Sequence, residues 1–398
     1  MKRWRKKRSR HQVALLIESS RSYARELLIG IAKYVRIHGS WSVEFKEGTP
    51  IHNVPEWFAS RKWNGIIAEV NNTVIAKAIR ECGAPVVDIN GDVPNLDFPV
   101  VRSDDTLIGR MAADHLIDRG FRQFAFFGVT GTTWSDLRRI GFENRVREAG
   151  FSFQAFMIPH FSREISEAEN DKHRKRFEKN LRGWLRSLPK PLGLMACNDA
   201  CAWQVLVCCQ DLKMRVPDEL AVIGVDNDEI FCELSKIPLS SVIINTRQIG
   251  YEAALLLDQL MAGESLSERV RLLKPVNVAE RRSTDALAIE DPQLIKVIQL
   301  IREHACDGLD VNMLLKEVPM SRRVLERQFA RILGRAPKEE ILRVRLKRVS
   351  QLLTESRLKL AAVAGKAGFE NPEHMCRLFK KKFGMTPGEF RNRTTMSR

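Results

Sequence analysis

Polar side chains that could bind a sugar follow several apolar, strand-like runs of this sequence. Carboxylates, Asn amides and an Arg guanidinium can chelate adjacent hydroxyl groups, and Trp or Tyr offers an apolar face to a sugar ring. Each residue alone could instead cap a helix, because Asp, Asn and Ser are favoured where a strand leads into a helix. Ser22 and Asp199 are good cap candidates. Taken as a set, the residues favour a ligand site, and its candidate members are Ser20, Tyr23, Asn90, Trp134, Arg138, Asn198, Asp226 and Asn245.

A second pattern occurs twice near the C-terminus and points to DNA. "RQFARILGRAP" (327–337) and "RLFKKKFGMTP" (377–387) carry Arg, Phe, Gly and Pro in the same four places. In a helix, each Phe lies on the apolar stripe, and each Arg lies off it and can reach outward. Arg can bond guanine bidentately in the major groove, while Lys380, Lys381 and Lys382 can supply salt-dependent affinity for phosphates. Either Arg alone could instead pair with a neighbouring Glu, but two copies in a basic region favour DNA contact.

The sequence carries no recognisable catalytic motif. It contains no GxSxG, GxxxxGK[ST] or HExxH, and no GxGxxG follows the first strand-like run. Its eight cysteines include no CxxC pair, so we expect buried, reduced thiols and no metal, cofactor or disulfide. An enzyme is therefore not expected.

Positive charge is concentrated at the two ends of the chain. The formal net charge is +16; seven of the first ten residues are Lys or Arg, and residues 291–398 contain 23 basic and 12 acidic side chains. The rest of the chain is close to neutral, which indicates nucleic acid as the partner of the C-terminal region. The apolar run after the basic start is too short for a signal peptide, and no stretch is long enough for a transmembrane helix. We therefore expect a cytoplasmic protein.

The sugar-binding candidates are positioned by an alternation of strand-like and helical runs over residues 11–284. Nearly continuous apolar strands between amphipathic helices predict an α/β fold with parallel sheets covered on both faces. The number of strands suits two lobes, with a ligand cleft at the carboxyl ends of the strands. The expected strands lie near 13–18, 41–45, 65–70, 85–90, 123–129, 192–199, 220–228 and 240–245.

The DNA-contact candidates are positioned by helices alone. After a linker (285–291), residues 292–391 predict two helix-turn-helix units joined by a long helix from Pro337 to about Glu355. Ser321 and Asn371 are expected N-caps, and Gly334 and Gly384 expected helix ends. Two such units can enter successive major grooves about 34 Å apart. A basic tail (1–10) and a C-terminal tail (392–398) complete the expected domain plan.

Residues 11–284 resemble the sensor domain of the LacI/GalR regulators, a two-lobed fold like that of periplasmic binding proteins. The resemblance rests on "VVRSDDTLIGRMAADHLIDRGFRQFAFFG" (100–128), "MACNDACA" (195–202), "VIGVDND" (222–228) and "ERRST" (280–284). It implies sugar contacts at Ser20, Asn90, Arg138, Asn198, Asp226 and Asn245. The chain departs from these regulators in one respect, because they carry DNA-binding helices before the sensor and only a basic segment of ten residues precedes it here.

Residues 291–391 resemble the AraC/XylS-type DNA-binding domain. The second unit, "AGFENPEHMCRLFKKKFGMTPGEFR" (367–391), is the more specific match. The resemblance implies base contacts at Arg322, Arg323, Glu326, Arg327, Pro372, Glu373, His374 and Arg377. Glu326 and Glu373 could accept from cytosine or pair with a nearby Arg.

The join of these two domains resembles the xylose operon regulator family. That resemblance implies a bacterial, nucleoid-associated transcription regulator with a pentose effector such as D-xylose. It also implies a homodimer on operator DNA and recruitment of RNA polymerase for activation. The alternative is a cytoplasmic sugar-binding protein whose basic helical domain serves assembly.

Overall fold

The computed structural model describes residues 11–39, 41–47, 55–159, 167–266, 268–285 and 291–395. These residues form two compact units. One contains two β-sheets, and the other contains the helices from Pro292 onward together with the segment His115–Arg122. The predicted basic tail, most of the predicted linker and residues 396–398 lie outside the described residues. In the part of the chain that is described, no helix is both long and apolar enough to cross a membrane.

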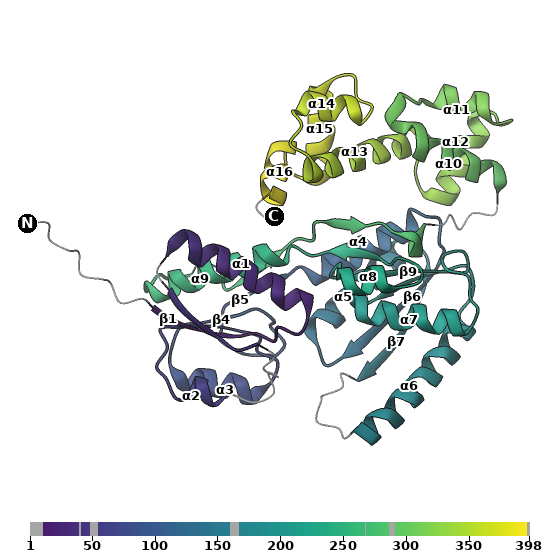
Figure 1. Cartoon of the computed structure of the whole chain (residues 1–398). Coiled ribbons are helices and arrows are strands. Elements are labelled where there is room, and N and C mark those ends of the chain that lie inside the picture. The colour runs from purple at the N-terminus through teal and green to yellow at the C-terminus, as the bar shows by residue number, and fades with distance from the viewer. Residues whose placement is uncertain are drawn as a thin grey trace, which may run out of the picture. The chain divides into compact units, whose positions relative to one another are not determined.

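The N-terminal lobe is a six-stranded parallel sheet in the order β11-β5-β4-β3-β1-β2. Helices α2 (Glu56–Ala59) and α3 (Thr73–Cys82) cover one face, and α1 (Ser22–His38) and α9 (Thr246–Met261) cover the other (Figure 1). The central strands are buried throughout, as is typical of parallel sheets with helices on both faces. The strands are β1 (His11–Leu16), β2 (Trp41–Phe45), β3 (Gly65–Ala68), β4 (Val86–Asp88), β5 (Val100–Ser103) and β11 (Val270–Leu273).

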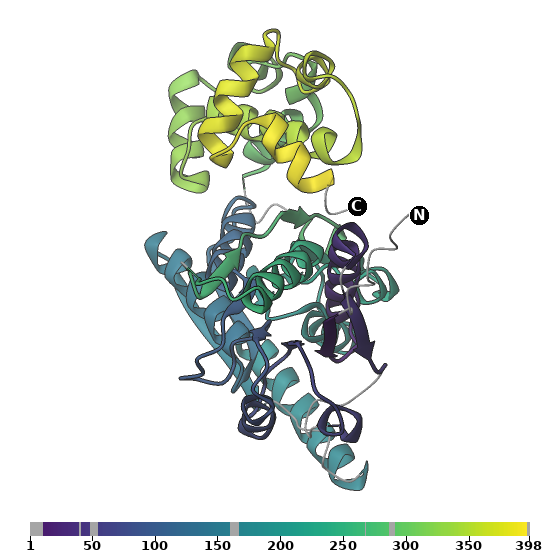
Figure 2. The same ribbon diagram turned by 90° about the vertical axis from the view of Figure 1, so that its left-hand side faces the viewer.

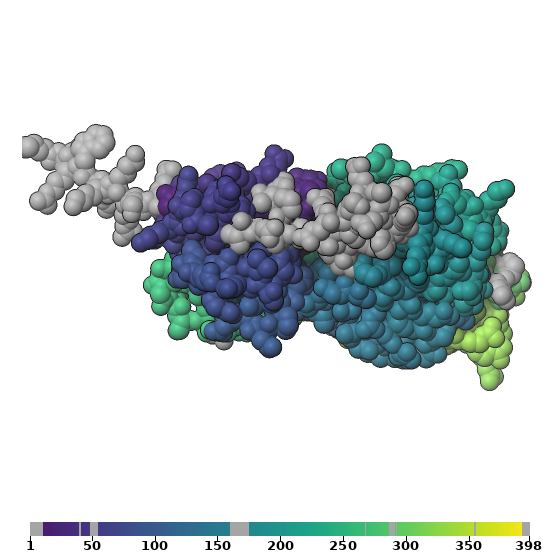
Figure 3. Space-filling model, turned by 90° about the horizontal axis from the view of Figure 1, so that it is seen from below, coloured from purple at the N-terminus to yellow at the C-terminus, as the bar shows by residue number. Residues whose placement is uncertain are grey.

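The C-terminal lobe is a second six-stranded sheet, in the order β12-β10-β9-β8-β6-β7, in which only β12 runs antiparallel. Its helices are α4 (Asp105–Ile117), α5 (Thr133–Glu148), α6 (Glu167–Ser187), α7 (Asp199–Asp211) and α8 (Glu229–Leu234). Its strands are β6 (Gln123–Thr130), β7 (Ser152–Pro159), β8 (Leu192–Ala196), β9 (Leu220–Val225), β10 (Ser240–Ile243) and β12 (Asn277–Ala279). Figure 3 shows the surfaces of the two lobes side by side, the N-terminal lobe in purple and dark blue and the C-terminal lobe in blue and teal.

Three chain segments pass between the lobes, after β5, after β10 and after β11. Backbone hydrogen bonds tie these segments together: the N–H of Asp104 donates to the carbonyl of Leu273 at 2.9 Å, and that of Val276 to the carbonyl of Ile243 at 2.9 Å. Such a short, hydrogen-bonded set of crossings allows the lobes to move about a common hinge.

The predicted α/β fold is confirmed, but four strands were not predicted, namely β5, β7, β11 and β12. β7, β11 and β12 lie at or next to sheet edges and are exposed or half-buried along much of their length. An edge strand needs no continuous apolar run, so its sequence lacks the pattern by which the central strands are recognised.

The second unit is entirely helical over its described residues (Figure 2). The long helix α13 (Pro337–Glu355) belongs to two apolar cores, with Ile341 in the first and Val349 in the second. The first helix-turn-helix unit contains α10 (Pro292–His304), α11 (Val311–Glu317) and α12 (Arg322–Leu333). The second helix-turn-helix unit contains α14 (Leu360–Lys366), α15 (Pro372–Phe383) and α16 (Pro387–Thr395).

The predicted helix boundaries of this unit are confirmed. The Ser321 hydroxyl accepts from the N–H of Val324, and the Asn371 amide oxygen accepts from the N–H groups of Glu373 and His374. Gly334 and Gly384 adopt the left-handed conformation that ends α12 and α15. These local signals determine where α12 and α15, the second helices of the two helix-turn-helix units, begin and end.

Candidate functional site

Arg138 lies at the centre of a buried polar cluster in the sensor. Its Nε donates to Asp105 Oδ1 at 2.9 Å, its Nη1 donates to the carbonyl oxygen of Cys197 at 2.6 Å, and Asp226 Oδ1 is 3.6 Å away. The guanidinium also stacks over the ring of Trp134, 5.1 Å from its centroid. Only 5% of the Arg138 side chain is exposed, so it interacts with both carboxylates in a region with little water, and Arg102 provides a second cation for Asp105 at 3.3 Å.

The close approach of α4 and α5 brings Arg138 to Asp105. A Cβ atom at Gly109 would lie 2.1 Å from the carbonyl oxygen of Arg138, and one at Gly141 would lie 2.0 Å from that of Thr106. Only glycine permits this approach, so the packing of these two helices sets the geometry of the cluster.

The N-terminal lobe supplies Tyr23 and Glu69 to the same cluster. Burial raises the pKa of the Tyr23 phenol well above its usual value, and the charges of Asp105, Glu69 and Asp226 raise it further. These interactions place Tyr23, from the first turn of α1, within electrostatic reach of residues from both lobes. The predicted residues Tyr23, Arg138 and Asp226 therefore converge, and Trp134 accompanies them.

Burial perturbs the acids of this region. It raises the pKa of Glu69 to about 7 and that of Asp226 to about 6, although Arg138 opposes the rise at Asp226. Burial opposes the charge of Arg138, but Asp105 and Asp226 outweigh it and raise the pKa of the guanidinium. Near neutral pH the cluster therefore offers carboxylate acceptors and a permanent cationic donor, the combination that binds vicinal hydroxyl groups.

Asp226 adopts a backbone conformation that non-glycine residues rarely take. Its φ is +102°, and the following residue, Asn227, has a φ of +53°. The N–H of Asp226 donates to the carbonyl of Val242 at 3.1 Å, and the N–H of Asn227 donates to the Ser241 hydroxyl at 2.9 Å. Neighbouring β10 thus holds a strained turn that presents the Asp226 carboxylate to Arg138.

Asn90 and Ser20 lie at the edges of the same region and already have side-chain partners. The Asn90 amide donates to Asp92, whose other carboxylate oxygen accepts from the N–H of Thr133 at 2.7 Å. The exposed Ser20 hydroxyl donates to Glu18 at 2.7 Å. Thr133 belongs to α5, so Asn90 lies close to the helix that carries Trp134 and Arg138.

Asn198 and Asn245 both begin helices. The Asn198 amide oxygen accepts from the N–H of Cys201 and caps α7, which leaves its NH₂ group as the part that can reach a ligand. Asn245 occupies the N-cap position of α9 without a side-chain cap bond. It lies where the chain crosses from β10 to the other lobe.

The two caps predicted at Ser22 and Asp199 were wrong. Arg21 occupies the N-cap position of α1, and the Ser22 hydroxyl instead donates across the lobes to Asp228 at 2.7 Å. The Asp199 side chain points into the lobe, where it accepts from Ser241 at 2.7 Å and from the N–H of Asp228 at 2.8 Å. A buried carboxylate must be hydrogen-bonded, and the Ser241 hydroxyl and the N–H of Asp228 provide donors for Asp199. The Asp199 side chain therefore bonds to them and does not cap α7.

Three acids near the site were not predicted, namely Glu69, Asp88 and Asp105. Asp88 ends β4, is 1% exposed and accepts from the N–H groups of Val70, Asn90 and Gly91. Each of the three lies at or just beyond the end of a strand, which is the signal that identified the other candidates.

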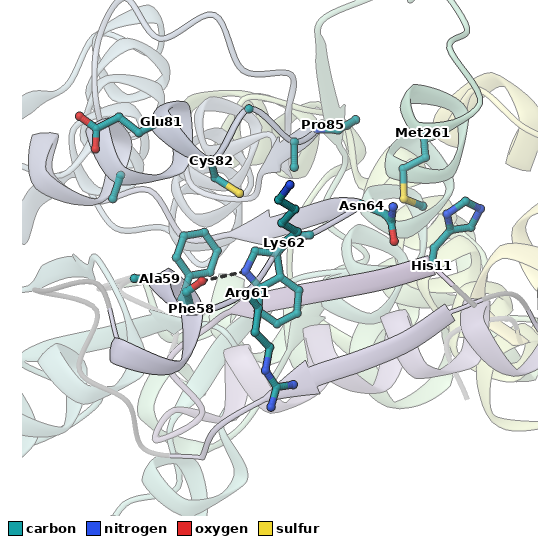
Figure 4. Close-up of a pocket in the computed structure, with 14 residues that line it drawn as sticks. His11, Phe58, Ala59, Arg61, Lys62, Asn64, Glu81, Cys82, Pro85 and Met261 are labelled. Atoms are coloured by element: carbon teal, nitrogen blue, oxygen red, sulfur yellow. Dashed lines mark hydrogen bonds between the residues drawn. The ribbon is translucent and has the colours of Figure 1, made fainter. Parts of the chain in front are cut away.

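A separate pocket of about 750 Å³ lies at the opposite, amino-terminal ends of strands in the N-terminal lobe (Figure 4). Its lining includes His11 at the start of β1, Asn64 just before β3 and Pro85 just before β4. In its wall, the Trp63 indole N–H donates to the carbonyl of Phe58 at 2.9 Å. It contains none of the sugar-binding candidates, so the polar cluster, not this pocket, is the candidate effector site.

In the helical unit, ten of the eleven predicted DNA contacts are exposed, and Pro372 is half-buried. Leu325 and Phe329 bury one side of α12, and Met375 and Phe379 bury the corresponding side of α15. The other side of each helix presents the predicted residues, which are Arg322, Arg323, Glu326, Arg327, Glu373, His374, Arg377, Lys380, Lys381 and Lys382.

Ion pairs distinguish the exposed residues of the two helices. Glu326 pairs with Arg322 one turn away, at 3.0 Å, which is one of the two roles considered for it. Within the described residues, no carboxylate pairs with Arg323, Arg327 or Arg377. These guanidinium groups are therefore available to an external acceptor.

Within the helical part of the chain, α13 holds the two helix-turn-helix units at a fixed spacing. Its 19 residues span about 28 Å. Arg345 of α13 donates to the carbonyls of Ala305 at 2.7 Å and Leu309 at 3.1 Å. These bonds anchor α13 to the first helix-turn-helix unit.

Three family models match the chain. A XylR N-terminal domain matches residues 12–102, a periplasmic binding protein-like domain matches 113–284, and a helix-turn-helix domain matches 314–393. Together they span both sheets and the C-terminal helices.

Full-length relatives carry the same plan. The chain is 31% identical to the xylose operon regulatory protein of Escherichia coli strain K12 over 96% of this chain and 97% of that protein. It is 30% identical to the protein of the same name from Haemophilus influenzae, over 96% and 98%. Among solved structures, the xylose-binding transcription activator XylR matches with a TM-score of 0.60 and 29% identity, covering 96% of this chain and 98% of that one. The chain therefore belongs to the family of xylose operon regulatory proteins, transcription regulators that join a periplasmic-binding-protein-like sensor to a C-terminal helix-turn-helix domain.

Proposed function

We propose that this protein is a one-component transcription regulator that binds D-xylose, or a closely similar pentose, and activates a pentose-catabolic operon. The observation that carries the proposal is the cluster of Tyr23, Glu69, Arg138 and Asp226, which draws on both lobes of a chain that also bears a basic helix-turn-helix unit. The xylose-binding title of the structural relative and the xylose operon name of the curated relatives support the choice of sugar.

In this proposal the effector holds the two lobes together. Asp226 and Arg138 bind adjacent hydroxyl groups of the sugar, Trp134 packs against its ring, and Tyr23 closes the site from the other lobe. Asn90, Ser20, Asn198 and Asn245 supply the remaining polar contacts. A ligand that contacts both lobes binds the closed arrangement more tightly than the open one, and so shifts the equilibrium toward the closed arrangement.

The second helix of each helix-turn-helix unit, α12 or α15, reads the DNA. Arg322, Arg323 and Arg327 of α12, and Glu373, His374 and Arg377 of α15, face the bases, while Lys380, Lys381 and Lys382 contact phosphates. A homodimer would bind two half-sites and recruit RNA polymerase in the bacterial cytoplasm. Non-enzymatic action follows from the same assignment, because the sugar is a signal and leaves unchanged.

The test compares two variants of the purified full chain, one expected to lose only the sugar response and one expected to lose only DNA discrimination. We expect D-xylose to raise the melting temperature and to tighten binding to the operon's upstream DNA. Asp226→Asn should lose the sugar response and keep basal DNA binding, because it removes a hydroxyl acceptor only from the sensor. Arg327→Ala should keep the sugar response and lose about 1–3 kcal/mol of DNA discrimination.

Arg357→Ala, which removes an exposed cation between α13 and α14, is the matched control and should change neither measurement. If no pentose shifts the melting temperature, the assignment of ligand class is wrong. If Arg327→Ala and Arg377→Ala leave sequence discrimination intact, the basic domain serves assembly and the alternative function is correct.

A further inference from the structure

Two buried cysteines lie side by side next to the candidate effector site. Cys197 follows β8 and Cys201 lies in the first turn of α7, and their sulfur atoms are 3.5 Å apart. They are 0% and 7% exposed. The Asn198 cap holds the N–H of Cys201 at 2.9 Å and so fixes the first turn of α7 against the segment that carries Cys197. No other two cysteine sulfurs among the described residues are within hydrogen-bonding distance.

The surroundings of Cys197 favour its thiolate. Burial opposes ionisation, but the thiol of Cys201, the charge of Arg138 and the hydroxyl of Ser135 outweigh it, and the pKa of Cys197 lies below its usual value. The pKa of Cys201 is raised well above its usual value, first by its bond to Cys197 and then by burial. One sulfur can therefore act as the nucleophile while the other keeps its proton as the resolving thiol.

The other buried cysteines of this lobe provide a contrast. Burial raises the pKa of Cys208 to about 11 and that of Cys209 to about 12. These two are neighbours in sequence on α7, and their sulfurs have no thiol partner of the kind that Cys197 and Cys201 provide for each other.

We propose that Cys197 and Cys201 form a reversible disulfide when the protein meets a peroxide, and that this bond weakens binding at the effector site. The first half is independent of the function proposed above, and the second half rests on it. The pair is thus an oxidation site placed directly behind the arginine of the sensor.

The reaction takes two steps. The Cys197 thiolate attacks one oxygen of the peroxide, a sulfur–oxygen bond forms, the oxygen–oxygen bond breaks, and the departing oxygen takes a proton and leaves as water when the oxidant is hydrogen peroxide. The thiol of Cys201 then attacks the sulfenic acid, the sulfur–sulfur bond forms and a second water leaves. The two thiols together lose two electrons, the peroxide gains them, and a dithiol reductant reverses the change.

The link to effector binding runs through the backbone of Cys197. Its carbonyl oxygen accepts from Arg138 at 2.6 Å. Drawing the sulfur of Cys197 toward α7 displaces the segment that carries this carbonyl, and Arg138 loses the partner that orients it toward Asp226. Loss of one charge-assisted hydrogen bond weakens binding by about tenfold or more.

The experiment begins with the reduced full chain treated with hydrogen peroxide. Free thiols are then alkylated after denaturation, and peptides are mapped by mass spectrometry. We expect a linked Cys197–Cys201 peptide two hydrogens lighter than the reduced form and restored by dithiothreitol. In Cys201→Ser, dimedone should trap a sulfenic acid at Cys197. Cys208→Ser and Cys209→Ser are matched controls on the same helix and should still form the linkage.

D-xylose affinity is then measured by calorimetry on reduced, oxidised and re-reduced protein. We expect at least about tenfold weaker binding in the oxidised form and full recovery on reduction. Complete alkylation of Cys197 and Cys201 after peroxide would overturn the disulfide, and this readout needs no variant to fold. Equal affinity in both forms would overturn its effect on the sensor. A reduced protein that binds no pentose would instead contradict the proposed function, while the peptide map still decides whether the disulfide forms.

Discussion

At Arg138, one guanidinium contacts the Asp105 carboxylate, the carbonyl of Cys197 and, at 3.6 Å, the Asp226 carboxylate. Its removal leaves Asp226 without its paired cation and leaves Asp105 with Arg102 alone. We expect Arg138→Met to lower the free energy of unfolding of the ligand-free protein by about 3–5 kcal/mol near pH 8.

The loss should shrink as the pH falls toward 5. Asp226 already has a pKa raised to about 6 by burial, with Arg138 opposing the rise, so removal of Arg138 raises it further. In the variant, protonation on acidification neutralises the uncompensated carboxylate, and the penalty disappears below that raised pKa. Denaturant unfolding at pH 5 and pH 8 measures both values. Arg110→Met, on α4 and in an exposed pair with Glu148, should cost less than about 0.5 kcal/mol at either pH. A pH-independent loss at Arg138 would mean that packing, not charge, is responsible.

The arginine itself was predictable from the sequence, whereas its main partner was not. Arg138, Asp226 and Tyr23 were identified as polar residues that follow strands. Asp105 and Glu69 carry the same signal, but their role depends on how closely α4 approaches α5 and on how the lobes meet. Those are tertiary distances that no local pattern encodes. The cap at Asn198 shows the same limit, because the adjacent Asp199 carries an equally good cap signal and tertiary hydrogen bonds decided between them.

Among the elements, the helices of the second unit were predicted most completely. Their caps, glycine ends and proline starts are local signals, so the positions of α12 and α15 follow from short stretches of sequence. The edge strands β7 and β11 were missed because both are exposed or half-buried along their length and so lack the continuous apolar run that marks a central strand.

α12 and α15 are expected to contribute differently to DNA binding. Lys380, Lys381 and Lys382 form the last turn of α15, where cations also suit the helix dipole. Replacing all three by Ala should weaken binding to every DNA sequence and reduce the slope of log affinity against log salt by up to about 2.7. The preference for operator over random DNA should change little, because phosphate contacts carry no sequence information.

Fluorescence anisotropy at several salt concentrations measures both quantities. A matched control replaces the exposed Lys338, Lys359 and Lys366, which removes the same charge from other parts of the unit. The prediction for α15 is wrong if the control reduces the slope as much as the lysine cluster does.

At the scale of the whole molecule, the sensor and the DNA-binding unit must exchange free energy if sugar is to control transcription. Thermodynamic linkage makes that exchange reciprocal: if D-xylose tightens operator binding by some factor, operator DNA must tighten D-xylose binding by the same factor. We expect this factor to lie between about 5 and 150, the usual range of coupling between two sites. Calorimetric titration of D-xylose with and without saturating operator gives one side of the cycle, and operator titration with and without D-xylose gives the other. Arg327→Ala should raise the operator concentration needed to change sugar affinity while leaving sugar affinity in the absence of DNA unchanged, because Arg327 belongs to the exposed face of α12. If the sugar binds and the operator binds but neither changes the affinity of the other, control passes through a third component, such as RNA polymerase, which responds to the sugar-bound form on DNA.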